Sequence, residues 1–208
     1  MLSRLAYRQF HDQTNVAVAT SVVLAEFGLT TLDSSRPRQE LTLHGLIQRG
    51  NYAEDRGMLL RNALRYLATA GLNYAILHDA GRTAALQHRV RSVSPDYAFQ
   101  FFGDLKSPAE PGFILEHVFS DDARLLLVEA RPSVRGLPMH VLLVRREGGL
   151  YYVMNSQSGE DHAYEPGHVA MHLASPVRMG PVSFAGQQYL YTGIAVRIWR
   201  EGTSNPPF

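Results

Sequence analysis

The apolar positions divide the chain into a helix-rich first half and a strand-rich second half. Residues 16–27 are mostly apolar and are followed by Gly28, which predicts a buried helix with a glycine just after its last turn. Apolar residues at positions 59, 60, 63, 64 and 67 recur with the 3.6-residue period of a helix that ends before Gly71. The helices predicted in this half cover residues 16–27, 41–49, 56–70 and 83–91.

The second half carries short runs of aliphatic and β-branched residues of strand length. Residues 124–130 predict a buried strand, and residues 192–199 predict a half-exposed one because isoleucine and valine alternate there with small or charged residues. The predicted strands cover residues 74–77, 124–130, 141–144, 151–154 and 192–199. The predicted fold class is therefore α+β, with helices packed on a mostly antiparallel sheet.

His140 begins one of these strands and Asn155 follows the next. The turn Glu147–Gly149 joins the two strands and predicts a β-hairpin. Pairing residues 141–144 with residues 150–154 brings His140 and Asn155 to the same end of the ladder, where neighbouring strands lie about 4.8 Å apart. An imidazole oriented by a side-chain carbonyl is half of a nucleophilic triad.

A polar segment upstream leads into the first predicted helix. Gln13 belongs to this segment, and the small residues Ala17 and Ala19 occupy the first turns of the helix. A nucleophile at a helix start is activated by the dipole of the helix. The sequence contains no cysteine, so no thiol can act as this nucleophile. Disulfides and thiolate metal sites are excluded for the same reason.

The order of these elements resembles the papain-like cysteine peptidases, nearest to relatives of bacteriocin-exporter leader peptidases and to bacterial papain-like effectors. In that pattern a glutamine precedes a cysteine on the first turn of a buried helix, which ends in an aromatic residue and a glycine, as Phe27 and Gly28 do here. The resemblance covers roughly residues 10–160. It implies a papain-like fold in which the nucleophile helix packs on the sheet.

The resemblance also implies a role for each candidate site residue. Ala17 stands where the catalytic cysteine belongs, and Ala19 is the second choice because it lies six residues after Gln13. His140 would act as the base and then the acid, and Asn155 would hold the imidazole tautomer. Gln13 would donate a hydrogen bond to the oxyanion.

Two histories account for the missing cysteine. One is an engineered Cys→Ala replacement, which is favoured because only the nucleophile is lost while His140 and Asn155 remain. The other is a natural pseudoenzyme that kept the fold and lost the chemistry. A serine nucleophile at Ser21 is disfavoured because it lies a full turn inside the helix, away from the N-terminal dipole.

A cysteine-dependent amide hydrolase acting on a peptide or protein is the function that the resemblance implies. The chemistry suits peptide cleavage by a processing peptidase and deamidation of a glutamine by a bacterial effector. Because the N-terminus is not a signal peptide, we expect the chain in the bacterial cytoplasm or delivered to a target cell by a specialised secretion system. The alternative is a naturally inactive domain that binds a peptide or protein partner.

Simpler roles exist for the same residues. A histidine on a strand is more often structural than catalytic, Asn155 suits a cap of the turn that follows it, and Gln13 suits a helix cap. His162, His168 and His172 suggest a metal site, but no third ligand has a fixed place, so a surface histidine cluster is the simpler interpretation. We therefore expect neither a metal nor a cofactor.

Length and charge limit the classes of function. The chain has 208 residues, 45% of them hydrophobic, and a net charge of +1, which suits one domain and predicts no nucleic-acid partner. No apolar run approaches the roughly 18 residues of a membrane span. We expect a single domain over residues 1–208, mainly helical in 1–110 and mainly sheet in 111–200, with a tail at 201–208.

Overall fold

The computed structural model describes residues 4–11, 14–32, 36–47, 60–93, 122–132 and 139–200. The helices in these ranges are α1 (Asn15–Glu26), α2 (Arg36–Ile47), α3 (Leu60–Thr69), α4 (Ala80–Val93), α7 (Pro166–Ala174) and the 3-10 helix η2 (Val177–Met179). The strands are β1 (Leu72–His78), β2 (Arg124–Ala130), β3 (Met139–Glu147), β4 (Leu150–Asn155), β5 (Glu160–Tyr164), β6 (Val182–Phe184) and β7 (Gln187–Arg200).

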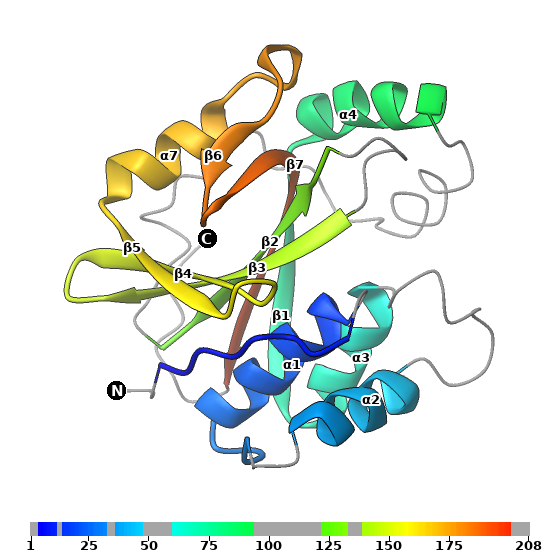
Figure 1. Cartoon of the computed structure of the whole chain (residues 1–208), viewed down its shortest axis with the longest axis vertical. Helices are drawn as coiled ribbons and strands as arrows, with labels where there is room; N and C mark the ends of the chain where they lie inside the picture. The colour runs from blue at the N-terminus through cyan, green and yellow to red at the C-terminus, as the bar shows by residue number, and fades with distance from the viewer. Residues whose placement is uncertain are drawn as a thin grey trace.

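The strands of the described residues pair into one antiparallel sheet. Its order is β1-β7-β2-β3-β4-β5, and β6 adds to β7. Helices α1, α2 and α3 group on one side of this sheet, and α7 lies on the other (Figure 1). The predicted α+β class, with helices on a mostly antiparallel sheet, is confirmed.

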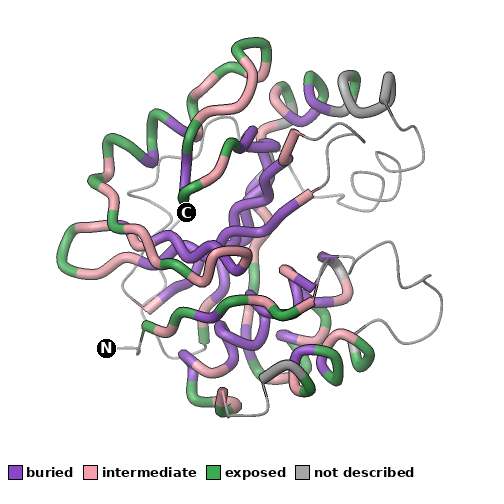
Figure 2. The backbone as a smooth tube through the Cα atoms, viewed as in Figure 1, coloured by how far each residue is buried: buried purple, intermediate pink, exposed green. Residues whose placement is uncertain are grey.

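The sheet separates two hydrophobic cores. Val141 and Leu143 of β3 face the core that α1, α2 and α3 cover, whereas Leu142 and Val144 face the core that α7 covers. This division follows from the two-residue period of a strand, which sends neighbouring side chains to opposite faces. Figure 2 shows the buried central strands between the more exposed outer helices.

The predicted hairpin forms, but residues 143–147 of β3, and not residues 141–144, pair with residues 150–154. Leu143 pairs with Met154, and Glu147 pairs with Leu150 across the turn. The two turn residues, Gly148 and Gly149, have φ angles of +59° and +84°. A two-residue turn with both φ angles positive matches the twist of the strands, and glycine adopts it without steric strain.

A buried ion cluster holds α1 against the sheet. The Glu26 carboxylate at the end of α1 forms ion pairs with Arg124 of β2 and, at 3.1 Å, with Arg145 of β3. Arg145 also pairs with Asp161 of β5. Glu26 further accepts a hydrogen bond from the Leu5 backbone N–H at 2.8 Å, so the cluster joins the N-terminal segment, the helix and three strands.

One predicted feature of the sheet is wrong. Strand β7 was expected to be half exposed, but its residues from Tyr189 to Ile198 are all buried, and Arg197 is only 1% exposed. The reason is that β7 is a central strand with a hydrophobic core packed on each of its two faces. The alternation seen in the sequence separates two cores instead of a core and a solvent face.

The boundaries of other elements differ modestly from the predicted ones. Helix α2 begins at Arg36, before the predicted start at residue 41, because proline is tolerated in the first turn of a helix. The segments β5, α7 and β6 were not predicted. Gln13 and the tail at 201–208 lie outside the described residues.

Candidate functional site

A hydrogen-bonded histidine–asparagine pair lies at one end of the β3–β4 hairpin. His140 Nε2 and Asn155 Oδ1 are 3.0 Å apart. The amide of Asn155 is held by two further contacts. Its Nδ2 donates to the Ala185 carbonyl at 2.9 Å, and its Oδ1 accepts from the Gln157 backbone N–H at 3.0 Å. The contact expected between the two side chains is present, and their catalytic roles stay a prediction.

These contacts assign the tautomer of the imidazole. Because Asn155 Nδ2 donates to Ala185, the oxygen of the amide faces His140, and the ring must donate through Nε2. Nδ1 then keeps its lone pair and is the atom able to accept a proton. Asn155 also begins the following turn, because its carbonyl accepts from the Gly159 N–H at 2.8 Å. The orienting and turn-capping interpretations of Asn155 are therefore compatible.

His140 is held in a buried, uncharged state. Its ring stacks on Tyr189 at a centroid distance of 5.4 Å and an interplanar angle of 7°, and the residue is 6% exposed. Burial lowers the pKa of His140 to about 4. The hydrogen bond that the ring donates to Asn155 raises this pKa, and the charge of Arg131 lowers it further. A neutral imidazole is the form a general base needs before it takes a proton.

The ion pair between Glu26 and Arg145 gives the position of α1 along β3. Figure 1 shows the helix and the strand running in the same direction. Asn15 begins the helix, about 16 Å before Glu26 at 1.5 Å per residue. His140 lies about 17 Å before Arg145 at 3.4 Å per strand residue. The first turn of α1 therefore comes level with His140 along β3, whereas the imidazole itself stacks on Tyr189 in the core on the α7 side of the sheet.

The rotation of α1 separates the two alanines considered as nucleophile positions. At 100° per residue, Ala19 lies on the same stripe of the helix as Asn15 and Glu26, and Glu26 contacts the sheet. Ala17 lies half a turn away, on the stripe with Ser21, which faces α2 and α3. Both alanines are buried, at 0% and 1% exposure. Helix phase therefore favours Ala19 over Ala17 as the nucleophile position. No contact between His140 and either alanine tests this assignment.

Asn15 is a candidate that the sequence interpretation missed. It is the first residue of α1 and lies on the sheet-facing stripe. Its side-chain Oδ1 is buried without a hydrogen-bond partner among the described residues. A buried acceptor without a partner is uncommon in proteins and suggests a place for a ligand or solvent group. The repeat of residues 15, 19, 22 and 26 at helical spacing is the sequence signal that marks this stripe.

Gln9 and Glu40 are also placed around this end of the molecule. Gln9 binds Ser156, the neighbour of Asn155, through both its backbone and its side chain. The buried Glu40 of α2 accepts hydrogen bonds from the backbone N–H groups of Phe10 and His11 at 3.0 and 3.1 Å, and from the Thr14 hydroxyl. Neither residue was predicted, because both act on a segment without regular structure.

The three C-terminal histidines do not form the surface cluster that was expected. His172 is buried, and its Nε2 lies 2.9 Å from Glu129 Oε1, while its ring stacks on Phe184. His162 pairs instead with Glu160 at 3.3 Å. The expected exposure of His172 is wrong because α7 turns it inward onto β2. No group of three potential metal ligands occurs within the described ranges.

Comparison with known proteins gives structural likeness without sequence similarity. No family model and no curated protein matches the sequence. A double-glycine-motif protease from an AMS/PCAT transporter, in complex with its leader peptide, is 10% identical, with 94% of this chain and 91% of that chain covered and a TM-score of 0.46. The peptidase domain of Streptococcus ComA, a bifunctional ABC transporter of a quorum-sensing pathway, is 8% identical, with coverages of 96% and 100% and a TM-score of 0.48.

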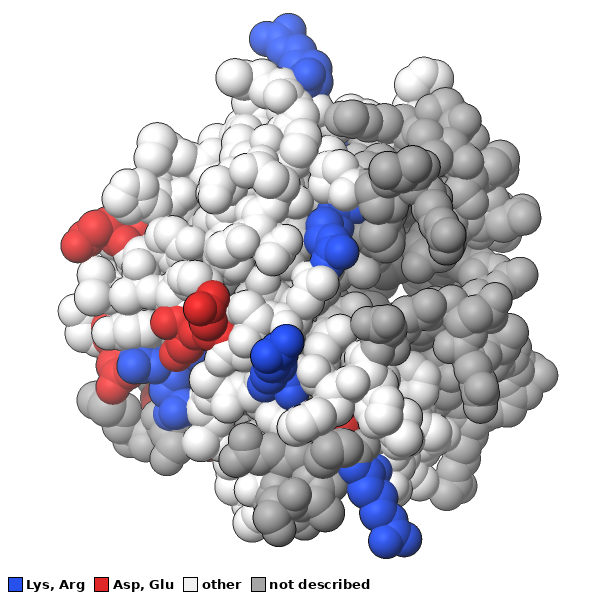
Figure 3. All heavy atoms as spheres, viewed as in Figure 1, with Lys and Arg blue, Asp and Glu red and all other residues white. Residues whose placement is uncertain are grey.

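The fold and the site together define an α+β domain with a buried, neutral histidine that an asparagine orients at one end of a β-hairpin. At these identities and TM-scores, functional inference rests on the site geometry alone. Charged side chains described on the face in Figure 3 are scattered and form no extended patch of one sign. Among the helices that the structure describes, none has the length and apolar character needed to cross a membrane.

Proposed function

We propose that this chain is a papain-like domain of the cysteine amide-hydrolase type that lacks its nucleophile and, in this form, binds a peptide or protein partner without cleaving it. The hydrogen bond between His140 and Asn155, level with the first turn of α1, carries the proposal. The absence of cysteine from the sequence supports the binding role, because the arrangement has a base and an orienting group but no thiol.

With a thiol in place, the same residues would support amide hydrolysis. His140 Nδ1 would take the thiol proton, and the sulfur would attack the amide carbonyl carbon. The imidazolium would then return its proton to the leaving amine, and a water molecule would release the acyl group in a second step. Asn155 would keep Nδ1 facing the reacting atoms by accepting from Nε2 throughout.

The position of the missing nucleophile is the part of the proposal that helix geometry addresses. Asn15 is favoured because it begins α1, lies on the sheet-facing stripe and has an unpartnered buried oxygen. Ala19 shares that stripe one turn further into the helix. Ala17 is the position that the resemblance to papain-like peptidases favours, although the helix phase turns it away from the sheet.

Three single-cysteine variants test these positions. Because the chain has no other thiol, Asn15→Cys, Ala17→Cys and Ala19→Cys can each be alkylated at one site. We expect Asn15→Cys to react near pH 6 at least about tenfold faster than the surface control Ser158→Cys, since a helix N-terminus and an imidazole stabilise the thiolate. The rate should fall when His140→Ala is added.

The fastest-reacting variant decides the assignment. If Ala17→Cys or Ala19→Cys is the most reactive and is the one slowed by His140→Ala, the nucleophile position moves to that residue. If none of the three exceeds the Ser158→Cys control, the catalytic origin of the site is refuted. Folding of each variant is checked by its unfolding transition, because Ala17 and Ala19 are fully buried.

Partner binding and the two possible reactions need separate measurements. For the chain as it stands, the NMR signals of His140 and Asn155 should shift saturably when a mixture of unstructured peptides is added, and no shift would exclude binding at this site.

For the most reactive cysteine variant, mass spectrometry of incubated proteins separates the reactions. A gain of about 1 Da at a glutamine, with no new terminus, indicates the deamidation expected of an effector, and new termini indicate peptide cleavage.

A further inference from the structure

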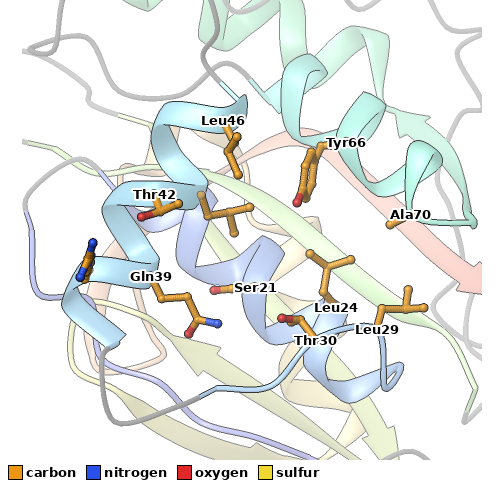
Figure 4. A pocket seen from close by; sticks show the side chains of 11 residues that line it. Ser21, Leu24, Leu29, Thr30, Gln39, Thr42, Leu46, Tyr66 and Ala70 are labelled. Carbon is orange, nitrogen blue, oxygen red and sulfur yellow. The ribbon is translucent and has the colours of Figure 1, made fainter.

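A cavity of about 480 Å³ lies on the helical side of the sheet, between α1, α2 and α3. Figure 4 shows Leu46 of α2 and Tyr66 of α3 facing each other, with Ser21 and Leu24 of α1 beneath them. The residues that line the cavity are Ser21, Leu24, Leu29, Thr30, Arg38, Gln39, Thr42, Leu43, Leu46, Tyr66 and Ala70. This volume is within the range of natural small-molecule sites, about 300–1,000 Å³.

The cavity is separate from the candidate site around His140. It uses the stripe of α1 that carries Ser21 and Leu24, whereas Asn15 and Glu26 lie on the opposite, sheet-facing stripe. A ligand in the cavity would therefore contact neither His140 nor Asn155. Its function does not depend on the proposed peptide site.

The walls of the cavity suit an apolar ligand body. Leu24, Leu29, Leu43, Leu46 and Ala70 supply aliphatic surface from all sides of the cavity. Two of the polar lining groups are already bonded within the protein. Ser21 Oγ donates to the Val18 carbonyl at 2.9 Å, and Gln39 Nε2 donates to the Thr31 carbonyl at 2.7 Å. A hydrocarbon chain would leave these two hydrogen bonds intact, and the remaining polar lining comes from Thr30, Thr42, Tyr66 and Arg38.

The single charged lining residue sets the preferred charge of the ligand. Arg38 lines the cavity, and no aspartate or glutamate does. Within the described ranges, no ion pair joins Arg38 to a carboxylate. A guanidinium presents donors in a planar fork that matches a carboxylate. The cavity is also open at its mouth, where Leu46 is 40% exposed.

We propose that this cavity binds a medium-length aliphatic carboxylate. The alkyl chain would lie between α1, α2 and α3 against the leucines, and the carboxylate would accept hydrogen bonds from Arg38. Chain burial supplies most of the affinity, because apolar area removed from water is the main favourable contribution. The charge on Arg38 supplies the selectivity for an anionic head group.

Titration calorimetry of the full chain with octanoate, octanol and octylammonium tests the proposal. Octanoate should bind saturably at one site, octanol about tenfold more weakly, and octylammonium not measurably, which follows from one charge-assisted contact. Absence of saturable octanoate binding, or equal affinity for all three compounds, would overturn the proposal.

Two variants and a matched control locate the binding. Arg38→Gln should weaken octanoate about tenfold and leave octanol unchanged, whereas Arg65→Gln, on the exposed face of α3 and outside the cavity, should change neither. Ala70→Phe should fill the cavity and abolish binding of both compounds while the unfolding midpoint is retained. Equal losses in Arg38→Gln and Arg65→Gln would show that only general surface charge attracts octanoate and would refute the site. Unchanged octanoate binding in Ala70→Phe would do the same if that variant is folded.

Discussion

Gln9 and Ser156 are joined twice, since the Gln9 N–H donates to the Ser156 carbonyl at 2.7 Å and the Ser156 hydroxyl donates to Gln9 Oε1 at 3.0 Å. The N-terminal segment is therefore fixed beside Asn155, the partner of the candidate base. The contact is close, because a Cβ on Gly159 would lie 2.6 Å from the Cβ of Arg8. The segment around Gln9 is thus part of the wall around the site.

Removing the Ser156 hydroxyl tests this attachment. Ser156→Ala deletes the side-chain hydrogen bond but keeps the backbone one, and should lower the free energy of unfolding by about 1 kcal/mol. Ser158→Ala is the matched control, because the Ser158 hydroxyl bonds only within its own turn and its loss should cost less. Urea unfolding measures both values, and equal losses would show that the link to Gln9 contributes nothing.

Glu40 should hold the segment before α1 in place. Its carboxylate accepts from the Phe10 and His11 N–H groups and from the Thr14 hydroxyl, and it is 1% exposed. In Glu40→Gln, an amide NH₂ replaces one acceptor and faces a donor, so we expect a loss of about 1–3 kcal/mol in unfolding free energy.

A second readout distinguishes positioning from general destabilisation by Glu40→Gln. In the Asn15→Cys background, the variant should slow alkylation of the folded protein, because the first turn of α1 is no longer held. Glu147→Gln is the control, since this partly exposed carboxylate pairs with Arg4 far from α1's first turn. Unchanged alkylation in a destabilised Glu40→Gln protein would limit the role of Glu40 to stability.

The buried imidazole should make the stability of the protein depend on pH. The pKa of His140 falls from 6.5 to about 4 in the folded state, so between these values the unfolded chain binds a proton that the folded chain does not. Above about pH 6.5 the imidazole is neutral in both states and does not lower the free energy of unfolding. As the pH falls towards 4, that free energy decreases by about 3 kcal/mol in total.

Urea unfolding at several pH values measures the effect of His140. His140→Gln should lose the part of the slope that lies between pH 4 and 6.5, because glutamine does not titrate. His168→Gln is the matched control, since it makes the same exchange at an exposed position of α7. An unaltered slope in His140→Gln would contradict the depressed pKa.

Exchanging the amide of Asn155 for a carboxylate should reverse the shift. In Asn155→Asp, a negative charge would lie about 3 Å from His140 Nε2 and stabilise the imidazolium, so an NMR titration should give a pKa more than one unit above that of the parent. The same change removes the donor to the Ala185 carbonyl and should cost stability. Asn155→Ala removes the hydrogen bond that raises the pKa of His140, so this pKa should not increase in that variant. A higher pKa of His140 in Asn155→Ala would contradict the assignment.

The hairpin and most helices could be predicted because their signals are local. Alternating and β-branched runs on both sides of Gly148–Gly149 specify the hairpin that carries His140 and Asn155 at the same end, although the register differs from the predicted one. The helix before Gly28 follows from its apolar run and its glycine stop. Local patterns therefore determined the element that carries the candidate base, as well as the α+β class.

The remainder of the site depends on contacts distant in sequence. Glu129 and His172 are 43 positions apart and meet only because α7 folds back on β2, so His172 looked exposed in the sequence. Gln9 meets Ser156 across 147 positions, and nothing in its neighbourhood marks that contact. The burial of Arg197 likewise depends on the strand order, which places β7 between β1 and β2.

Strand β7 runs for 14 residues and is common to both cores, with Ile194 and Val196 in the core under α1 and Tyr191 and Ala195 in the core under α7. Opening either side exposes apolar residues of β7 and removes packing from the strand that forms the ladders to β1 and β2. Native-state amide exchange should therefore show one common opening free energy along the strand, equal to that of global unfolding. Two layers that look separable would then behave as one cooperative unit, and a ligand bound on either side would slow exchange on both.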